Sequence, residues 1–360
     1  MNNFVNDAKI EKHLQNLRAL QAPSGLFLAS PRGVDTGYDK AWLRDNVYEA
    51  LAFSATGDWD TVRRVYRAIL DTLLKHEDKI KWAHEHKPSY AWQYIHARYS
   101  PETFEEFWEE WGNKQNDAIG AILFQIGNLE EFGGGFIKDD NDRRIIQRLV
   151  YYLASVEYWH DPDAGMWEEN EEVHASSVGA CVAGLKAIAK LPGFEVSPSL
   201  ISSGVEALSK LLPRESESKF ADLAQLSLIW PYRIVAPEMA LQILENVTYH
   251  LEKRRGVIRY KTDRYYNKNK DGWSEEAEWC FGLSWLALCY NALSEREKAE
   301  HYLARAGDVA TPDEKIPELY FSNSDKPNEN IPLGWAESMY VVALQSISPP
   351  HLSEASRKPH

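Results

Sequence analysis

Residues 59–76 read WDTVRRVYRAILDTLLKH and carry the clearest helical signal in the chain. Asp58, directly after Gly57, is expected to cap the N-terminus of this helix, because a short carboxylate accepts hydrogen bonds from the first free backbone N–H groups. Apolar side chains recur here at intervals of three and four residues, which places them on one helical face: Val62, Val65, Tyr66, Ile69, Leu70, Leu73 and Leu74.

The same period recurs along the whole chain. Further apolar stripes lie at 145–153, at 178–185 and at 243–251, and the last of these follows Pro237 at a suitable first-turn position. Strand signals are few, and 256–260 is the short candidate. We expect about twelve helices, over residues 4–20, 42–55, 59–76, 115–129, 142–158, 175–190, 199–212, 218–229, 237–253, 276–292, 295–307 and 334–346.

Short links between these helices alternate with long, aromatic-rich connections. Long connections in compact proteins are usually functional. If the helices alternate between an inner and an outer ring, alternate connections lie at the same end, so the long ones would line one mouth. No linker-like run divides the chain, so we expect one all-α domain over 1–350 and a flexible tail at 351–360. The long connections are 21–41, 78–114, 159–174, 254–275 and 308–333.

The composition excludes several classes of protein. Hydrophobic residues make up 44% of the 360 residues and charged residues 26%, so the chain can bury a core and is not disordered. A formal net charge of −14 repels phosphate backbones, which argues against nucleic-acid and anionic-membrane partners. Residues 1–20 are polar and amphipathic, without the apolar core of a secretory signal, and no run approaches a membrane span. We expect a cytoplasmic protein.

Cysteine and histidine give no metal signal. The three cysteines have no metal-site spacing, and Cys280 and Cys289 lie in an apolar helical run, where cysteine is usually a small buried hydrophobe. His84 and His86 lack a third ligand at a suitable spacing. We therefore expect neither a metal nor an organic cofactor.

Three segments combine charged residues with apolar or aromatic neighbours. In 161–170, DPDAGMWEEN, two carboxylates follow a tryptophan; a carboxyl packed against an indole suits a general acid, although acids also favour helix starts. In 316–320, IPELY, Glu318 follows a proline, in a position where a glutamate is ordinarily just solvated. In 41–48, AWLRDNVY, Arg44 and Asp45 are too costly to bury unless they pair or bind something polar, so a sugar contact and a structural salt bridge both stay open.

Together these segments resemble glycoside hydrolase family 15, the glucoamylases, and also the N-terminal region of the phosphorylase kinase α and β regulatory subunits. The resemblance covers about residues 20–346. Its motifs are W-x-R-D at 42–45, W-G-x-x-Q-x-D at 111–117, W-E-E at 167–169, G-x-x-R-Y-x-x-D-x-Y at 256–265, P-E at 317–318 and P-L-x-W at 332–335. After Tyr266 the chain reads NKNKDGWSEEAEW, where glucoamylases carry a G-N-P-W stretch.

The resemblance implies an (α/α)6 barrel and an inverting, exo-acting hydrolase that releases glucose from the non-reducing end of short α-glucans. Glu168 would be the general acid and Glu318 the general base. Arg44 and Asp45 would hold the terminal glucose, and Glu169 would bind the next sugar. The full set of substrate-binding residues that it implies is Trp42, Arg44, Asp45, Trp111, Trp167, Glu169, Arg259, Tyr265, Trp279 and Trp335.

Two other functions stay open. The kinase-subunit resemblance permits a non-catalytic carbohydrate-binding or regulatory module, although a pure binder needs no pair of opposed acids. A hydrolase or lyase acting on uronic acids would need basic residues at the mouth, and the acidic balance of the chain offers that reading little support. The linkage of the substrate is open among α-1,4, α-1,6 and trehalose.

Overall fold

The computed structural model describes residues 2–109, 111–266 and 275–347. Two short antiparallel pairs accompany the helices: β1 (Ala41–Trp42) with β2 (Arg98–Tyr99), and β3 (Glu278–Trp279) with β4 (Leu319–Tyr320). Two short 3-10 helices are η1 (Ala91–Gln93) and η2 (Leu223–Leu228). The α-helices within these residues are α1 (Asn2–Leu20), α2 (Leu43–Thr56), α3 (Trp59–Lys75), α4 (Glu77–Glu85), α5 (Asn116–Phe132), α6 (Asp140–Val156), α7 (Ala175–Ile188), α8 (Pro198–Leu211), α9 (Pro237–Leu251), α10 (Phe281–Ala292), α11 (Arg296–Asp308) and α12 (Gly334–Ile347).

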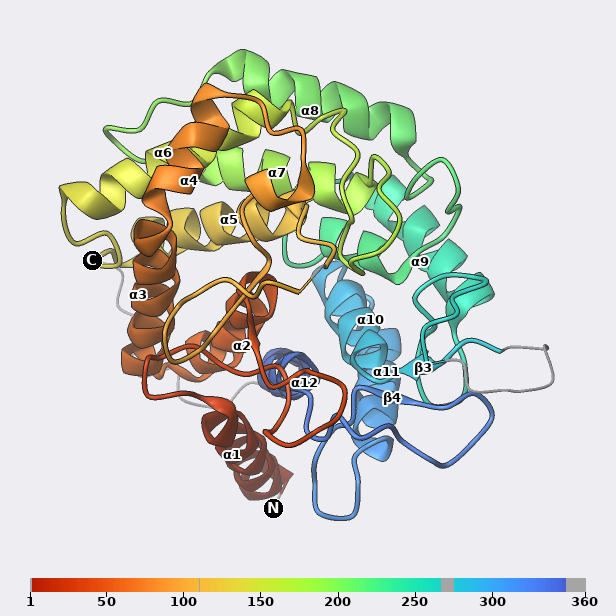
Figure 1. Cartoon of the computed structure of the whole chain (residues 1–360). Helices are drawn as coiled ribbons and strands as arrows, with labels where there is room; N and C mark the ends of the chain where they lie inside the picture. Colours follow the sequence, from red (N-terminus) through yellow and green to blue (C-terminus); the bar gives the residue numbers. More distant parts are fainter. Residues whose placement is uncertain (1, 110, 267–274, 348–360) are drawn as a thin grey trace, which may run out of the picture.

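The helices form two concentric rings (Figure 1). The inner ring runs α2, α5, α7, η2, α10 and α12, each packed against the next, and α12 closes the ring on α2. The outer ring is α1, α3, α6, α8, α9 and α11, and α4 packs outside against α6. The predicted all-α (α/α)6 barrel is therefore confirmed.

Burial follows the two rings. In α7 every residue except Lys186 is buried, because an inner helix meets neighbours on all sides. In α3, by contrast, one apolar stripe is buried while Arg63 and Arg64 stay exposed. Asp58 caps α3 as predicted, since its side chain accepts from the N–H of Thr61.

Small residues let α5 and α7 approach closely. A Cβ on Gly120 would lie 2.4 Å from the carbonyl carbon of Ala180, and one on Gly184 would lie 2.5 Å from the carbonyl oxygen of Gly120. No side chain fits at such distances, so this inner-ring contact depends on glycine.

Residues 218–229 are the clearest helix prediction that is wrong. They contain only η2, which Asp222 and Gln225 cap together. The hydroxyls of Ser216 and Ser218 donate to Glu172, which holds the preceding residues in a loop. A proline at 231 disfavours the helical conformation at Trp230, so the segment cannot lengthen at its other end.

Other differences are smaller. α4 begins at Glu77 and occupies the start of the predicted connection 78–114. It buries only Ile80 and Ala83, too few positions to show a helical period. The helix predicted from 276 begins at Phe281 as α10, because residues 278–279 pair with β4 instead. The strand predicted at 256–260 is reduced to isolated bridges of Val257 and Tyr260.

Several predictions concern residues that the structure does not describe. The tail at 351–360 and the end of the predicted domain near 350 lie outside the described residues, as does most of 267–275 in the connection 254–275. Within the described residues, none of the helices has the length and apolar character of a membrane span. The three cysteines are buried and unpaired with one another.

Candidate active site

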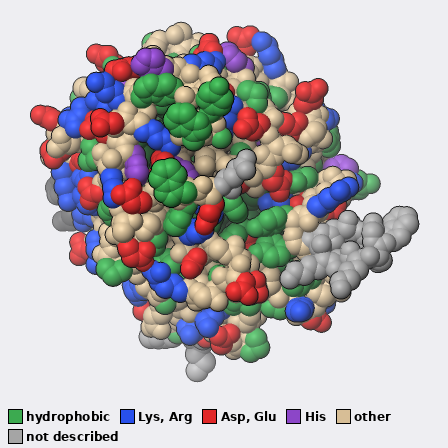
Figure 2. All heavy atoms as spheres, in the orientation of Figure 1, with side chains coloured by type: hydrophobic (Ala, Val, Ile, Leu, Met, Phe, Trp, Pro, Cys, Tyr) green, Lys and Arg blue, Asp and Glu red, His purple; other side chains and the backbone are tan. Residues whose placement is uncertain are grey.

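A pocket opens at the N-terminal ends of the inner helices α2, α10 and α12. It is narrow, with a cavity volume of about 50 Å³. In Figure 2 the same face of the ring as in Figure 1 shows a hollow near its centre, where hydrophobic side chains gather beside charged ones. The pocket is lined by Tyr38, Trp42, Arg44, Asp45, Met166, Trp167, Glu168, Arg259, Trp279, Phe281, Glu318, Leu333 and Trp335.

Arg44 and Asp45 enter the pocket because strand β1 leads directly into α2. Both side chains are buried, and the Arg44 guanidinium donates to Gln115 at 2.8 Å and to Asp117 at 3.3 Å. Burial raises the pKa of Asp45 to about 7, although the charge of Arg44 acts in the opposite direction. The pair is therefore both a structural ion pair and a pocket wall.

Glu168 lies at the tip of a pinned loop. Asp163 and Glu172 pair through their backbones at its base, and the side chain of Asp163 accepts from the N–H of Asn116 at the start of α5. Glu168 itself has φ +62°, a left-handed conformation that costs a residue with a Cβ on the order of 1 kcal/mol. Gly112 permits this loop to pass, since a Cβ there would lie 2.7 Å from the Glu168 carbonyl oxygen.

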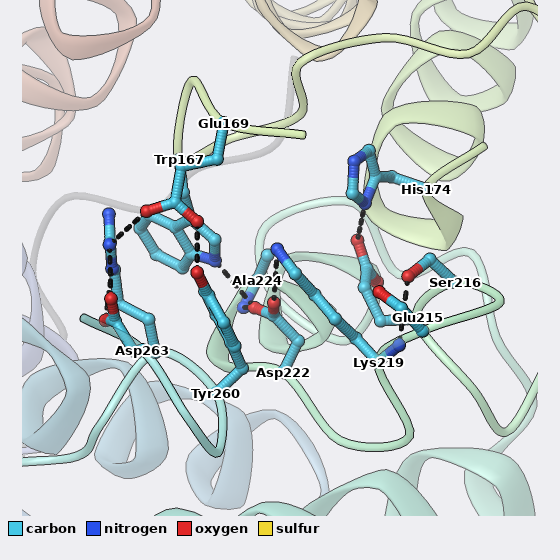
Figure 3. A network of polar contacts seen from close by, with 12 residues as sticks. Trp167, Glu169, His174, Glu215, Ser216, Lys219, Asp222, Ala224, Tyr260 and Asp263 are labelled. Carbon is cyan, nitrogen blue, oxygen red and sulfur yellow. Dashed lines mark hydrogen bonds and ion pairs between the residues drawn. The ribbon is translucent and has the colours of Figure 1, made fainter. Parts of the chain in front are cut away.

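Three donors surround the Glu168 carboxylate. Gln115 Nε2 donates to Oε1 at 2.7 Å and Arg44 donates to the same oxygen at 3.4 Å, while the indole of Trp111 donates to Oε2. The indole of Trp167 instead donates to Asp222 at 2.8 Å (Figure 3). The tryptophan that contacts the predicted acid through a hydrogen bond is thus Trp111, not its sequence neighbour.

Glu318 lies in the C-terminal part of the sequence and is held in place beside the strand pair β3 and β4. It directly precedes β4, and its carbonyl accepts from Cys280 N at 3.0 Å, which ties it to the segment between β3 and α10. Its side chain is buried, and the amides of Asn328 and Asn330 both donate to Oε2, at 2.5 and 2.7 Å. Burial raises the pKa of Glu318, and hydrogen bonds from these amides and Tyr38 offset part of that rise.

Tyr38 links the two predicted catalytic groups electrostatically. Burial raises its pKa well above the ordinary value, and the charges of Glu318, Tyr265 and Glu168 raise it further. The charges of Glu168 and Glu318 likewise both raise the pKa of Asp45. The two glutamates, separated by 150 positions in the sequence, therefore act on the same small volume.

Glu169 belongs to a second network of polar contacts (Figure 3). It accepts from the guanidinium of Arg259 and from the hydroxyl of Tyr260. Asp263 holds the other side of Arg259, with two hydrogen bonds of 2.7 Å. The guanidinium carbon lies 4.7 Å from the ring centre of Trp279, so aromatic contact and charge pairing fix it together.

The model of the family described as Glycosyl hydrolases family 15 matches residues 7–344. The chain belongs to this family. Its helical barrel is also found in solved structures of other proteins. It superposes on a wild-type glycosidase with a TM-score of 0.80 at 19% identity, covering 94% of this chain and 96% of the other. With the glucoamylase of Hormoconis resinae the TM-score is 0.70 at 12% identity, and the match covers 97% of this chain and 74% of the glucoamylase.

Sequence relatives of this family 15 chain include kinase subunits. It is 27% identical to a probable phosphorylase b kinase regulatory subunit alpha of Caenorhabditis elegans, over 84% of this chain and 30% of that protein. It is 26% identical to the liver isoform of the phosphorylase b kinase regulatory subunit alpha of Mus musculus, over 91% of this chain and 32% of that protein. The chain thus spans about a third of the length of these curated relatives.

Within this family 15 barrel, the structure brings the sequence-predicted residues into one region. Glu169 and Tyr265 stand at the edge of the pocket, and Trp111 contacts Glu168 from outside its lining. Polar contributors that were not singled out from the sequence include Tyr38, Gln115, Asn328 and Asn330. Gln115 stands in the W-G-x-x-Q-x-D segment and could have been found there, whereas the asparagines carry no local signal. The sequence-predicted residues that line the pocket itself are Trp42, Arg44, Asp45, Trp167, Glu168, Arg259, Trp279, Glu318 and Trp335.

Proposed function

We propose that this protein is an inverting, exo-acting α-glucoside hydrolase that releases glucose from the non-reducing end of short α-glucans. The observation that carries the proposal is the presence of Glu168 and Glu318 in the lining of one pocket, on separate loops. Membership of a family of glycosyl hydrolases supports it.

In this mechanism, Glu168 donates a proton to the glycosidic oxygen as the bond to the anomeric carbon breaks. A water molecule attacks that carbon from the opposite side, and Glu318 takes its proton. Inverting enzymes place the two carboxyls roughly 6.5–9.5 Å apart to admit the water. Because both amides bind Oε2 of Glu318, Oε1 is the oxygen we assign to the water.

The shape of the pocket supports action at a chain end. Its inner wall consists of Arg44, Asp45 and Trp335, which lie at the starts of inner helices and are buried. A single terminal sugar would meet charged hydrogen-bonding groups there and an aromatic face beside them. The rest of the substrate would extend toward the mouth, past Glu169 and Arg259.

The test is the release of glucose from maltose, isomaltose, panose, trehalose and starch. We expect Glu168→Gln and Glu318→Gln each to lower kcat by about 10²-fold or more, since positioned acid–base groups contribute on that order. The fold should persist, because each change keeps the shape of the side chain. Glu171→Gln is a matched control, as Glu171 is exposed in the same loop as Glu168 and lies outside the pocket lining. Full turnover by either active-site variant would refute the role given to that residue.

The second candidate is a carbohydrate-binding regulatory module, which the similarity to the named kinase regulatory subunits favours. Such a module would bind sugars from the same panel without hydrolysing any of them. Calorimetric binding combined with a glucose assay separates the two functions. Saturable binding of a disaccharide with no glucose released would favour the module over the hydrolase.

A further inference from the structure

A second cavity of about 920 Å³ adjoins the catalytic pocket. Glu169 and Tyr265 form part of its wall and stand at the border between the two. Glu169 binds Arg259 of the catalytic pocket, and the Tyr265 ring stacks at 6.2 Å on Trp279. The cavity is lined by Glu169, Asn170, Ser218, Lys219, Phe220, Ala221, His250, Leu251, Tyr260, Lys261, Thr262, Arg264 and Tyr265. We call it the basic chamber.

The chamber lies on the side of the catalytic pocket where the leaving group of a substrate would be. Glu169 follows the proposed acid Glu168 directly, and that acid protonates the oxygen of the leaving group. A sugar unit released on this side would therefore lie beside Glu169 and Tyr265, and its outer substituents would reach the chamber.

The charge of the chamber differs from that of the whole chain. The chain has a net charge of −14, yet Lys219, Lys261 and Arg264 line this cavity. The acid in its lining is Glu169, whose carboxylate is already engaged by Arg259 and by the Tyr260 hydroxyl. The chamber therefore presents more positive than negative charge to a ligand.

Lys219 is a buried cation in the lining of the chamber, and Figure 3 shows it beside Asp222 and Tyr260. Its ammonium lies 3.9 Å from the centre of the Tyr260 ring and 3.6 Å from Asp222 Oδ2. Asp222 also accepts from the Trp167 indole and from Ala224 N through its other oxygen. The Asp222 charge is thus shared among several donors, and the ammonium keeps capacity to donate.

Lys261 and Arg264 form the exposed rim. Neither makes an ion pair with an acid among the residues that the structure describes. Glu276 is near this rim and accepts from the backbone N–H of Thr262. Hydroxyl groups of a neutral sugar need no cation, whereas phosphate and carboxylate groups are bound strongly by lysine and by the guanidinium fork.

We propose that the basic chamber binds an anionic group on the leaving sugar, so that the preferred substrates are α-glucosides whose aglycone carries a phosphate or a carboxylate. This rests on the proposed hydrolase function. In the reaction, water supplies the hydroxyl at the anomeric carbon, the glycosidic oxygen leaves with the proton from Glu168, and the anionic group stays unchanged. The acidic balance of the whole chain, which offers little support for a substrate made of uronic acids, does not describe this local surface.

The experiment compares maltose and trehalose with their derivatives phosphorylated at C6 of the leaving glucose, and with the glucosyl-glucuronate analogue of maltose. At low ionic strength we expect kcat/KM to be at least tenfold higher for an anionic substrate than for its neutral parent. The advantage should shrink in 0.5 M NaCl, because exposed charges are screened. A larger gain for the phosphates or for the glucuronate identifies which anion the chamber prefers.

The double variant Lys261→Gln, Arg264→Gln should reduce this anionic preference at least fivefold. The control variant Lys210→Gln, Lys298→Gln removes two positive charges from exposed positions on α8 and α11, outside the chamber lining, and should keep the preference. Equal kcat/KM for neutral and anionic substrates would overturn the inference and leave the hydrolase proposal standing. If no substrate is hydrolysed, but the phosphates bind at least tenfold more tightly in a manner that depends on Lys261 and Arg264, the chamber stands and the hydrolase proposal fails.

Discussion

The chemistry of the pocket depends on how individual carboxyl groups are surrounded. Glu168 accepts from an indole, an amide and a guanidinium, whereas Glu318 accepts from two asparagine amides and is more deeply buried. The two carboxyls thus lie in different environments, but the roles of acid and base given to them rest on the family motifs and not on these environments. From the sequence, the two glutamates could be proposed by motif, but Asn328, Asn330 and Tyr38 could not, because their roles arise only when the loops meet.

The raised pKa of Glu318 leads to a prediction about pH. A general base must be ionised, so kcat/KM should fall as the pH drops through the pKa of Glu318, which burial places above the usual range for glutamate. Asn330→Ala removes a donor that stabilises the ionised form, so this variant should shift the acidic limb to higher pH. The measurement is the profile of kcat/KM from pH 4 to 8, with Glu171→Gln as a control. An unmoved limb in Asn330→Ala would show that another group controls it.

At the scale of helices, the sequence predicts well where a helix shows one apolar stripe, as α3 does. It fails where the apolar spacing has another cause. Residues 218–229 have helical spacing, but side-chain bonds to Glu172 and the cap at Asp222 restrict them to a short turn. The start of α10 was misplaced because strand pairing with β4, a contact distant in sequence, overrides local preference.

The contact between α5 and α7 gives a prediction about stability. Gly120→Ala would place a methyl group 2.4 Å from a backbone carbon of α7, so we expect unfolding to become easier by about 1–3 kcal/mol. Gly133→Ala is the control, since a Cβ there meets nothing within 4 Å. Urea unfolding of both variants measures the difference. Equal stability of the two would contradict the close approach of these helices.

A buried pair at the start of α7 gives a second prediction at this scale. Burial alone would lower the pKa of His174, but its hydrogen bond with Glu215 and the charge of Asp163 raise it to about 9. The ordinary value is about 6.5, so the stabilisation from protonated His174 is complete below about pH 6.5 and is lost as the pH rises through about 9.

We therefore expect the free energy of unfolding to fall on the order of 2 kcal/mol between these pH values. His174→Gln should lose most of this pH dependence. Urea titrations of both proteins at pH 6 and pH 9.5 make the comparison. If raising the pH from 6 to 9.5 lowers the free energy of unfolding of the wild-type protein no more than that of the variant, a protonated His174 is ruled out.

At the scale of the molecule, the ring explains why residues from distant segments share one pocket. The connections that precede the inner helices α2, α7 and α12 bring Tyr38, Glu168 and Glu318, respectively, to the same end. The sequence predicted this arrangement because long, aromatic-rich connections alternate with short ones. It could not predict the basic chamber, since Lys219 comes from one loop and Lys261 and Arg264 from another, and overall composition hides their proximity.

We propose that Glu168 and Glu318 together hydrolyse an α-glucoside with inversion. Proton NMR of the anomeric signals during the first minutes of hydrolysis tests it most directly, with the best substrate of the panel and with Glu318→Gln beside the wild-type protein. We expect β-glucose to form first, to mutarotate later, and not to be formed at a comparable rate by the variant. Initial release of α-glucose, or β-glucose released equally fast by Glu318→Gln, would contradict it.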